Sequence, residues 1–240
     1  MLEISEKFDR PDQIRRIFDV GIALLALALF SPIILLICCA ILIESGGPIL
    51  FSQVRLGRHG RPFRILKFRK FRQKCESPGL PLTLNNDPRM SAVGRILART
   101  KLDELPQFVN VLRGEMAIVG PRPESLDFVD CFTSVNRQVL KHLPGIFGPS
   151  QLAFRNECAF YPDNSDPASF YRKVLFPIKI SIDLAYYPHR SLLSDLKWVL
   201  TGVLAVFGLH ELSIGLSAPI RTSAYRIRGA DKRQRLKWHG

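Results

Sequence analysis

The longest hydrophobic feature of the chain is an apolar run from Val20 to Ile43, twenty-four residues without a charge. As a straight helix this run would be about 36 Å long, enough to cross the hydrocarbon core of a bilayer. It is too long for the apolar core of a secretory signal peptide, and no small-residue cleavage site follows it cleanly. The pattern therefore predicts a membrane-associated helix near the N-terminus.

Two features of this run argue against a simple membrane span. Ser31 and Pro32 interrupt its middle, where a proline removes one helical hydrogen bond and bends the helix. Both flanks are basic, so the positive-inside rule favours the cytoplasmic side for both ends. The flanking residues are Lys7, Arg10, Arg15 and Arg16 before the run and Arg55, Arg58 and Arg61 after it. A re-entrant helix broken at the Ser-Pro step satisfies both flanks, and an ordinary kinked transmembrane helix is the alternative.

After the breaker Ser-Gly-Gly-Pro, the pattern predicts short elements. Residues 49–71, "ILFSQVRLGRHGRPFRILKFRKF", alternate as a basic hairpin of two strands around Gly57 to Pro62. Helices are expected at 91–100, from 102 to 112, over 174–187 and from 192, with loops at 78–90, 144–150 and 156–168. The last apolar stretch, Trp198 to Leu209, is too short to span a bilayer and is expected to be interfacial or core. The predicted fold is mainly α with a small β-hairpin.

Composition indicates an anionic partner. The formal charge is +13, which suits nucleic acid, lipid headgroups or phosphorylated substrates. The charge clusters beside apolar segments, and neither an aromatic-interleaved RNA motif nor a recognition helix is visible, so lipids are favoured and no nucleic acid is expected. The five cysteines lack C-x-x-C spacing and predict neither a disulfide framework nor a zinc site, which fits a reducing, cytosolic setting. The chain is expected to divide into three regions: a basic segment with the re-entrant helix (1–46), a compact interfacial domain (47–210) and a basic tail (211–240).

The candidate chemistry centres on "TKLDELPQ", residues 100–107, where Asp103 and Glu104 are adjacent. One interpretation is structural: Thr100 and Asp103 match a capping box, or Asp103 itself caps a helix that begins near Pro106. The other is catalytic, because an ionised Asp can attack phosphorus while a neighbouring Glu helps to bind Mg²⁺. Side chains at i and i+1 point about 100° apart on a helix, so the pair would not share one proton.

Four further positions were considered for this chemistry. Arg122 lies between Pro121 and Pro123, which hold its backbone extended and suit it to grip a phosphate, although a solvated turn is the plain alternative. Lys67 is a weaker phosphate candidate, since most charges in a basic run are solvated or face lipid headgroups. Asp183 and Asp195 are expected to be structural pairing partners.

These motifs resemble the bacterial sugar transferases, the monotopic polyprenol-phosphate phosphoglycosyl transferases. The resemblance extends from about Arg15 to Thr201. It rests on the Ser-Pro step, "PFRILKFRKF", "NNDPRMSAVGRILARTKLDELPQFVNVLRGEMAIVGPRPE", "PGIFGPSQL" and "DLAYYPHRSLLSDLKWVL". The long block around "LDELPQ" is the most specific part.

The resemblance implies a reaction and a location. Asp103 would attack the β-phosphate of a UDP-sugar, releasing UMP, and undecaprenyl phosphate would then take the sugar phosphate from the aspartate. Asp103 and Glu104 would bind Mg²⁺, and Arg122 and Lys67 would hold phosphates. The protein would lie on the cytosolic face of the bacterial inner membrane, in contact with lipids, as the first membrane step of polysaccharide or glycoconjugate assembly. A homo-oligomer is compatible with the sequence.

One position departs from the family pattern. Ala98 stands five residues before Asp103, where the family usually has Arg. Arg99 is the expected substitute for phosphate binding, and Lys101 adds a charge nearby. If neither compensates, the chain would be a non-catalytic membrane-surface scaffold, which is the alternative function. The sugar cannot be decoded from residues 75–86 or 155–169, the loops expected to set specificity.

Overall fold

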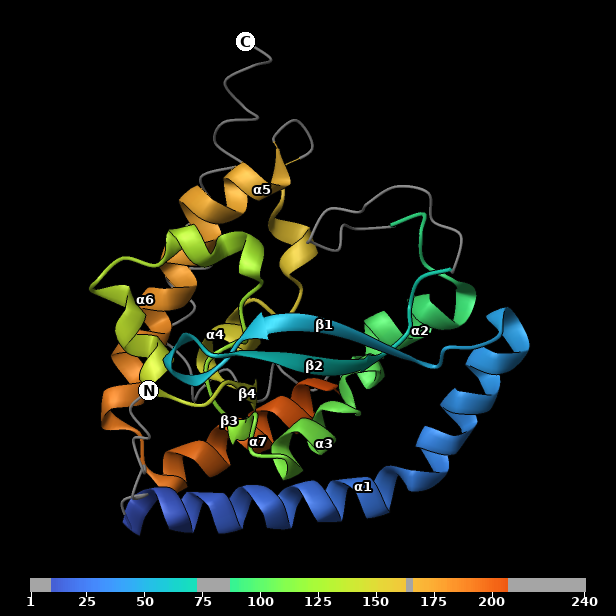
Figure 1. Ribbon diagram of the computed structural model, residues 1–240, viewed down its shortest axis with the longest axis horizontal. Coiled ribbons are helices and arrows are strands. Elements are labelled where there is room, and N and C mark those ends of the chain that lie inside the picture. The colour runs from blue at the N-terminus through green and yellow to red at the C-terminus, as the bar shows by residue number, and fades with distance from the viewer. Residues whose placement is uncertain (1–9, 73–86, 163–165, 207–240) are drawn as a thin grey trace, which may run out of the picture.

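The apolar run forms most of one long helix, α1 (Arg10–Ser45), in the computed structural model, which describes residues 10–72, 87–162 and 166–206. Figure 1 shows α1 lying along the base of the molecule and then turning upward toward its C-terminal end. Pro32 has no N–H to donate to the Ala28 carbonyl, and the Ser31 hydroxyl donates to that carbonyl instead, at 2.8 Å. The expected broken helix is therefore one continuous, bent helix whose freed carbonyl is satisfied locally.

The bend lets both arms of α1 pack on one hydrophobic core. Ala23 and Ala26 on the first arm and Ile37 and Ile41 on the second belong to the same buried cluster. A straight helix of this length would extend about 54 Å, so its far arm would leave that cluster. The Ser-Pro step therefore decides how much of α1 contacts the rest of the chain.

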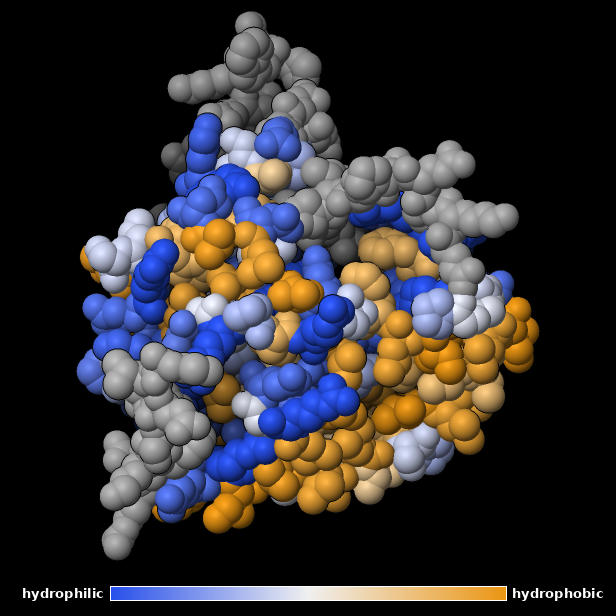
Figure 2. Space-filling model, viewed as in Figure 1, coloured by the Kyte–Doolittle hydropathy of each residue, from blue (hydrophilic) through white to orange (hydrophobic). Residues whose placement is uncertain are grey.

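Most large side chains of α1 face outward. Within the described residues, α1 alone has the length and composition to cross a bilayer, and only 11% of its most apolar window is buried. A second exposed apolar stripe lies on α7 (Leu192–Val206). The exposed large apolar side chains are Ile14, Ile17, Leu24, Leu25, Leu29, Ile33, Leu35, Leu36, Leu42 and Ile43 on α1, and Leu192, Leu193, Leu196, Leu200 and Val203 on α7. Figure 2 shows a broad apolar surface over α1 along the base of the molecule.

The predicted hairpin is confirmed as β1 (Leu50–Leu56) paired antiparallel with β2 (Pro62–Phe68). Asn110, which is fully buried, attaches β2 to the short helix α3 (Gln107–Leu112). Its side-chain oxygen accepts from the Leu66 amide at 2.9 Å, and its side-chain nitrogen donates to the Arg64 carbonyl at 2.8 Å. This connection places the C-terminal half of β2 beside the segment that precedes α3.

The expected loop at 144–150 is wrong in part. Gly145–Phe147 form β4, which pairs in parallel with β3 (Ala117–Val119), and α4 (Pro149–Ala153) follows directly. The two strands meet closely: a Cβ on Gly120 would lie 2.2 Å from the Leu143 carbonyl oxygen. Glycine and proline read as turn formers in the sequence, but here glycine is needed for the close approach of two strands.

The predicted helices are confirmed, with irregular turns added between them. The regular helices not yet bounded are α2 (Ala92–Thr100), α5 (Pro167–Phe170) and α6 (Phe176–Tyr186), and a π-helical turn, Tyr171–Leu175, joins α5 to α6. Short 3-10 segments occur at Arg58–Gly60, Leu102–Glu104, Leu126–Cys131, Asn136–Lys141, Glu157–Phe160 and Tyr187–His189. A second, aromatic-rich core lies around α6 and includes Phe128, Tyr171 and Phe176.

The division of the chain at residues 46 and 210 stays a prediction, and the tail 211–240 lies outside the described residues.

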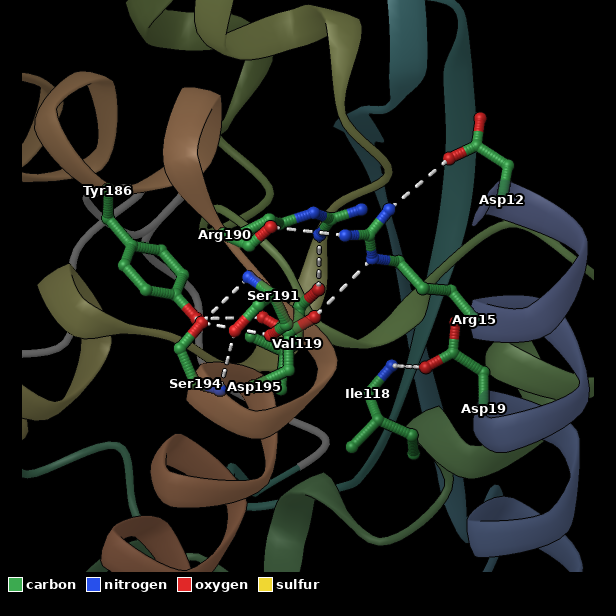
Figure 3. Close-up of polar contacts among 10 residues, drawn as sticks. All are labelled: Asp12, Arg15, Asp19, Ile118, Val119, Tyr186, Arg190, Ser191, Ser194 and Asp195. Atoms are coloured by element: carbon green, nitrogen blue, oxygen red, sulfur yellow. Dashed lines mark hydrogen bonds and ion pairs between the residues drawn. The ribbon is translucent and has the colours of Figure 1, made fainter. Parts of the chain in front are cut away.

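A polar network attaches the first arm of α1 to β3 and to the start of α7 (Figure 3). Asp19 accepts a hydrogen bond from the Ile118 amide at 2.9 Å. Arg15 lies 3.6 Å from the Asp195 carboxylate and donates to the Arg190 carbonyl at 3.2 Å. Asp195 is therefore the structural pairing partner that the sequence predicted, and the first arm of α1 is held by polar as well as apolar contacts.

Both arms of α1 also satisfy helix ends in the rest of the chain. Arg16, on the first arm, donates to the last carbonyls of α3, at 2.5 Å to Val111 and 2.9 Å to Leu112. Glu44, at the far end, accepts from the first amides of α2, with Ala92 at 2.6 Å. A cation at a helix C-terminus and an anion at a helix N-terminus are each favourable. The two ends of α1 therefore bind the same body of protein.

Candidate functional site

Asp103 is almost completely buried, with 1% of its surface exposed, in the 3-10 turn between α2 and α3. The Nζ atom of Lys70 lies 3.1 Å from its Oδ2 atom. Its Oδ1 atom is buried and has no hydrogen-bond partner in the described part of the chain. A buried carboxylate with one neutralised oxygen and one free oxygen is unusual, because buried polar atoms are nearly always hydrogen-bonded.

The capping interpretation of Asp103 is wrong. The Thr100 hydroxyl donates back to the Ile96 carbonyl at 2.9 Å, as helical threonines commonly do. Helix α3 begins after Pro106 without a side-chain cap, and the 3-10 turn that holds Asp103 has none either. Capping therefore does not explain why an aspartate is buried at this position.

Glu104 forms an ion pair with Lys67, whose Nζ atom lies 2.8 Å from Oε1. Burial acts to raise the pKa of Glu104, but the charges of Lys67, Arg122 and Lys101 outweigh it and hold that pKa well below the usual range. Glu104 is therefore ionised at neutral pH. Glu104 and Asp103 thus form ion pairs with Lys67 and Lys70, two lysines at the same end of the hairpin. Of these two lysines, the sequence singles out only Lys67.

Close packing of α2 against the end of β2 positions Lys70. The amide of Ser91, the N-cap of α2, donates to the Lys70 carbonyl at 3.0 Å. A Cβ on Gly94 would lie only 2.0 Å from that carbonyl oxygen. The glycine in "SAVGRILART" is therefore needed because α2 rests directly on the backbone of Lys70.

Arg122 follows β3, lies between two prolines and is partly buried. Burial acts to lower its pKa, but Glu104, Glu157 and Glu124 outweigh this effect and raise it. Despite these neighbours, the guanidinium makes no hydrogen bond or ion pair with any residue that the structure describes. Its donors are therefore free for an external anion.

The structure adds two arginines that the sequence analysis had not selected. Arg155 is close enough to Glu104 for the carboxylate to oppose the burial that lowers the arginine's pKa. At Arg55, on β1, burial and the like charge of Arg122 both lower the pKa of the guanidinium. Arg155 lies in a turn-rich segment and Arg55 in a run of basic residues, so neither had a distinguishing local pattern. Together with Lys67, they surround Glu104 and Arg122 with positive charge suited to a diphosphate.

The substitute proposed for Ala98 is not brought to this cluster. Arg99 lies on the exposed face of α2 and makes no side-chain contact with the charged residues above in the described ranges. Lys101, in the left-handed conformation with φ 63°, does contribute positive charge near Glu104. Lys101 is thus better placed than Arg99 to compensate for Ala98, and a phosphate role for Arg99 stays a prediction.

The residues present fit a magnesium ion. No group of three histidine, cysteine, aspartate or glutamate side chains gathers as a metal site within the residues described. Mg²⁺, however, commonly uses one or two carboxylates and completes its shell with water and substrate phosphates. The free Oδ1 of Asp103 and the ionised Glu104 offer such an incomplete set of hard oxygen donors.

Comparison with known proteins gives consistent similarities. The family described as "Bacterial sugar transferase" matches residues 10–208. The chain is 42% identical over 142 residues to a UDP-N-acetylgalactosamine-undecaprenyl-phosphate N-acetylgalactosaminephosphotransferase of Aeromonas hydrophila, covering 58% of this chain and 34% of that protein. It is 33% identical over 207 residues to the exopolysaccharide production protein ExoY of Rhizobium meliloti (strain 1021), covering 80% of this chain and 84% of ExoY.

A third relative is the UDP-glucose:undecaprenyl-phosphate glucose-1-phosphate transferase of Escherichia coli (strain K12). It is 35% identical to this chain over 198 residues, covering 81% of this chain and 40% of the relative. The chain thus spans well under half the length of the Aeromonas and Escherichia relatives and most of the length of ExoY.

Proposed function

The chain belongs to the bacterial sugar transferase family, and we propose from this that it transfers a sugar-1-phosphate from a UDP-sugar to undecaprenyl phosphate and releases UMP. The observation that carries the proposal is the buried Asp103 carboxylate, neutralised by Lys70 on one oxygen and free on the other. The names of the Aeromonas and Escherichia relatives describe the same type of transfer.

In the first half-reaction, Oδ1 of Asp103 attacks the β-phosphorus of the UDP-sugar. A bond forms between the carboxylate oxygen and phosphorus, and the bond between that phosphorus and the bridging oxygen breaks, so UMP leaves with the electron pair. Lys70, at Oδ2, holds the carboxylate in one orientation. The product is a sugar-phosphoryl-aspartate.

In the second half-reaction, a phosphate oxygen of undecaprenyl phosphate attacks the same phosphorus. The bond from phosphorus to the Asp103 oxygen breaks, which regenerates the carboxylate and forms undecaprenyl-diphosphate-sugar. Both steps bring anions together, so positive charge fixed in the site lowers the barrier. Arg122, Lys67 and Arg155 supply that charge, and Arg122 can bind one phosphate through two parallel hydrogen bonds.

Magnesium would be held by Asp103 and Glu104, where it would offset the charge of the diphosphate. The chain's own residues prepare this site. Lys67 keeps Glu104 ionised and oriented at 2.8 Å. Because only 2% of the Asp103 side chain is exposed, covering side chains must move before a phosphate can approach.

A re-entrant α1 is part of the proposal. Arg16 near one end of α1 binds α3, and Glu44 at the other end binds α2. Both contacts are to the body of the protein that carries Asp103, which can occupy only one side of a membrane. This arrangement supports a helix that enters the bilayer and returns, with the catalytic body on the cytosolic face of the inner membrane and lipids against α1.

The identity of the released nucleotide tests the proposal. The purified chain in detergent is incubated with Mg²⁺, undecaprenyl phosphate and a panel of UDP-sugars, and the nucleotide products are separated. UMP from any donor supports phosphoglycosyl transfer and identifies the sugar. UDP would instead indicate ordinary glycosyl transfer. The scaffold alternative, which predicts no release from any donor, is not favoured because the carboxylates and cations are all present.

A further inference from the structure

A buried group of charged and phenolic side chains lies behind Arg122 and has no part in the proposed reaction. Lys179, on α6, is 2% exposed. Its Nζ atom lies 2.9 Å from Oε2 of Glu157 and donates to the Tyr171 hydroxyl at 3.0 Å. Tyr171 donates to the Glu124 carboxylate, 2.8 and 2.7 Å from its two oxygens. One lysine is thus shared by two carboxylates from separate segments: Glu157 pairs with it directly, and Glu124 is linked to it through the phenol and by a longer ion pair of 3.8 Å.

The same two carboxylates act on Arg122. Glu157 and Glu124, with Glu104, raise the pKa of the arginine above its ordinary value although burial opposes them. A guanidinium and a carboxylate that meet away from water commonly form a two-pronged ion pair. Within the residues described, no such pair forms at Arg122. The contacts of both carboxylates are made instead with the lysine and the tyrosines.

The hydrogen bonds explain why these carboxylates stay away from Arg122. Glu157 is held on both oxygens, by Lys179 on Oε2 and by the Tyr161 hydroxyl on Oε1 at 2.7 Å. Burial acts to raise the pKa of Glu157, but the charges of Lys179 and Arg122 outweigh it and lower that pKa to about 2. Glu157 is therefore a full negative charge whose oxygens are already occupied.

We propose that Lys179 is a positioning residue that keeps Arg122 free to bind substrate phosphate, an inference that rests on the proposed function. Without the lysine, the buried Glu124 and the partly buried Glu157 would lose the cation that they share, while Arg122, whose pKa they both raise, would remain nearby. Because an unpaired buried charge is strongly unfavourable, the carboxylates would turn to the guanidinium and occupy its donors. Lys179 thus acts on the phosphate site through Glu157 and Glu124 without touching the substrate.

UDP binding, measured by calorimetry on the full-length chain in detergent with magnesium, separates this role from simple structural support. Lys179→Gln is expected to weaken UDP binding about 10-fold, similar to Arg122→Gln, as loss of one charge-assisted contact would. Removing the second charge as well, in Lys179→Gln/Glu157→Gln, should restore affinity to within about 3-fold of wild type. In an Arg122→Gln background, Lys179→Gln should change affinity little further. Lys173→Gln, at an exposed lysine of the adjoining π-helical turn, is the matched control.

The outcomes separate the two proposals. Wild-type protein that does not bind UDP contradicts the proposed function itself. Lys179→Gln protein that folds and binds UDP as wild type does would overturn the inference alone. If Lys179→Gln protein does not fold, the Lys179→Gln/Glu157→Gln variant is used to test the inference, because it removes both charges of the Lys179–Glu157 ion pair. A folded double variant that binds UDP as weakly as Arg122→Gln would also overturn the inference.

Discussion

The ammonium group of Lys70 lies 3.1 Å from Oδ2 of Asp103 and leaves the buried Oδ1 without a partner. Local helical hydrogen bonding does not account for this arrangement, because Asp103 caps no helix. The pairing depends on two close approaches, of β2 to α3 through Asn110 and of α2 to the Lys70 backbone at Gly94. The free oxygen is consistent with a nucleophile.

Asp103→Asn is expected to reduce UMP release by at least about 1000-fold, because a carboxamide cannot replace a carboxylate as nucleophile. The variant should remain folded and membrane-bound, since the amide fills the same volume. Asp130→Asn is the matched control, because Asp130 is exposed and pairs with Arg172 outside the cluster. Near-normal turnover of Asp103→Asn would remove Asp103 from the chemistry.

Gly94→Ala is expected to lower both stability and activity. The added Cβ would lie 2.0 Å from the Lys70 carbonyl oxygen, so α2 or the Lys70 backbone must shift, with an overpacking cost of about 1–3 kcal/mol. The shift would also move the Lys70 ammonium away from Asp103. Gly21→Ala is the control, because its Cβ would meet nothing within 4 Å. Equal melting temperatures and activities for the two variants would contradict the packing described at Lys70.

Ala98→Arg is expected to strengthen UDP binding. The family resemblance indicates an arginine at this position, and Ala98 is half-buried on α2 beside the turn that holds Asp103. If Lys101 already supplies the missing charge, Ala98→Arg should increase UDP affinity by a larger factor in a Lys101→Ser background than in the wild type. Calorimetry of the two single variants and the double variant measures this coupling. Equal affinity in all backgrounds would mean that position 98 has no role in phosphate binding here.

The pH dependence of stability should change with Asp183, which accepts a hydrogen bond from Ser150 at 2.8 Å. Burial raises the pKa of Asp183 to about 7, although Ser150 and Lys179 oppose it. Between about pH 4 and 7 the folded chain therefore retains a proton that the unfolded chain releases, and wild-type stability falls as pH rises through this window. The loss of folding free energy is at most about 1.4 kcal/mol per pH unit.

The Asp183→Asn variant has no ionisable group at this position and does not lose stability in this way. Its melting temperature should therefore rise relative to that of the wild type from pH 4 to pH 8. Burial lowers the pKa of His142 to about 4, so His142 makes stability increase as pH rises. This effect is the same in the variant and the wild type and cancels when their melting temperatures are subtracted. Parallel curves for the two proteins would show that Asp183 is ionised throughout in the folded state.

The topology of α1 can be measured by labelling single cysteines at Asp12 and Ser52, in a chain whose native cysteines are replaced. The contacts of Arg16 and Glu44 with the same body of protein lead us to expect both sites on the cytoplasmic side. An impermeant thiol reagent should then label neither site in intact cells and both sites after permeabilisation. Labelling of Asp12→Cys alone in intact cells would replace the re-entrant helix with a span.

The sequence by itself determined the features that depend on local order. The uncharged run and the Ser-Pro step predicted a long, interrupted apolar helix, and alternation around Gly57 predicted the hairpin, because periodicity and turn chemistry act over a few residues. The adjacent carboxylates and the arginine between two prolines also singled out Asp103, Glu104 and Arg122, whose charges all act on Lys67 in the structure.

Only the tertiary structure decided which partners these residues have. Lys67 and Glu104 are separated by 37 positions and Lys179 and Glu157 by 22, and no periodic pattern connects them. The parallel pairing of β3 with β4 was missed because strands of only three residues, flanked by glycine and proline, have a weak local signal. Such contacts arise when distant segments pack around a shared core, so their free energy belongs to the packing and not to either segment alone.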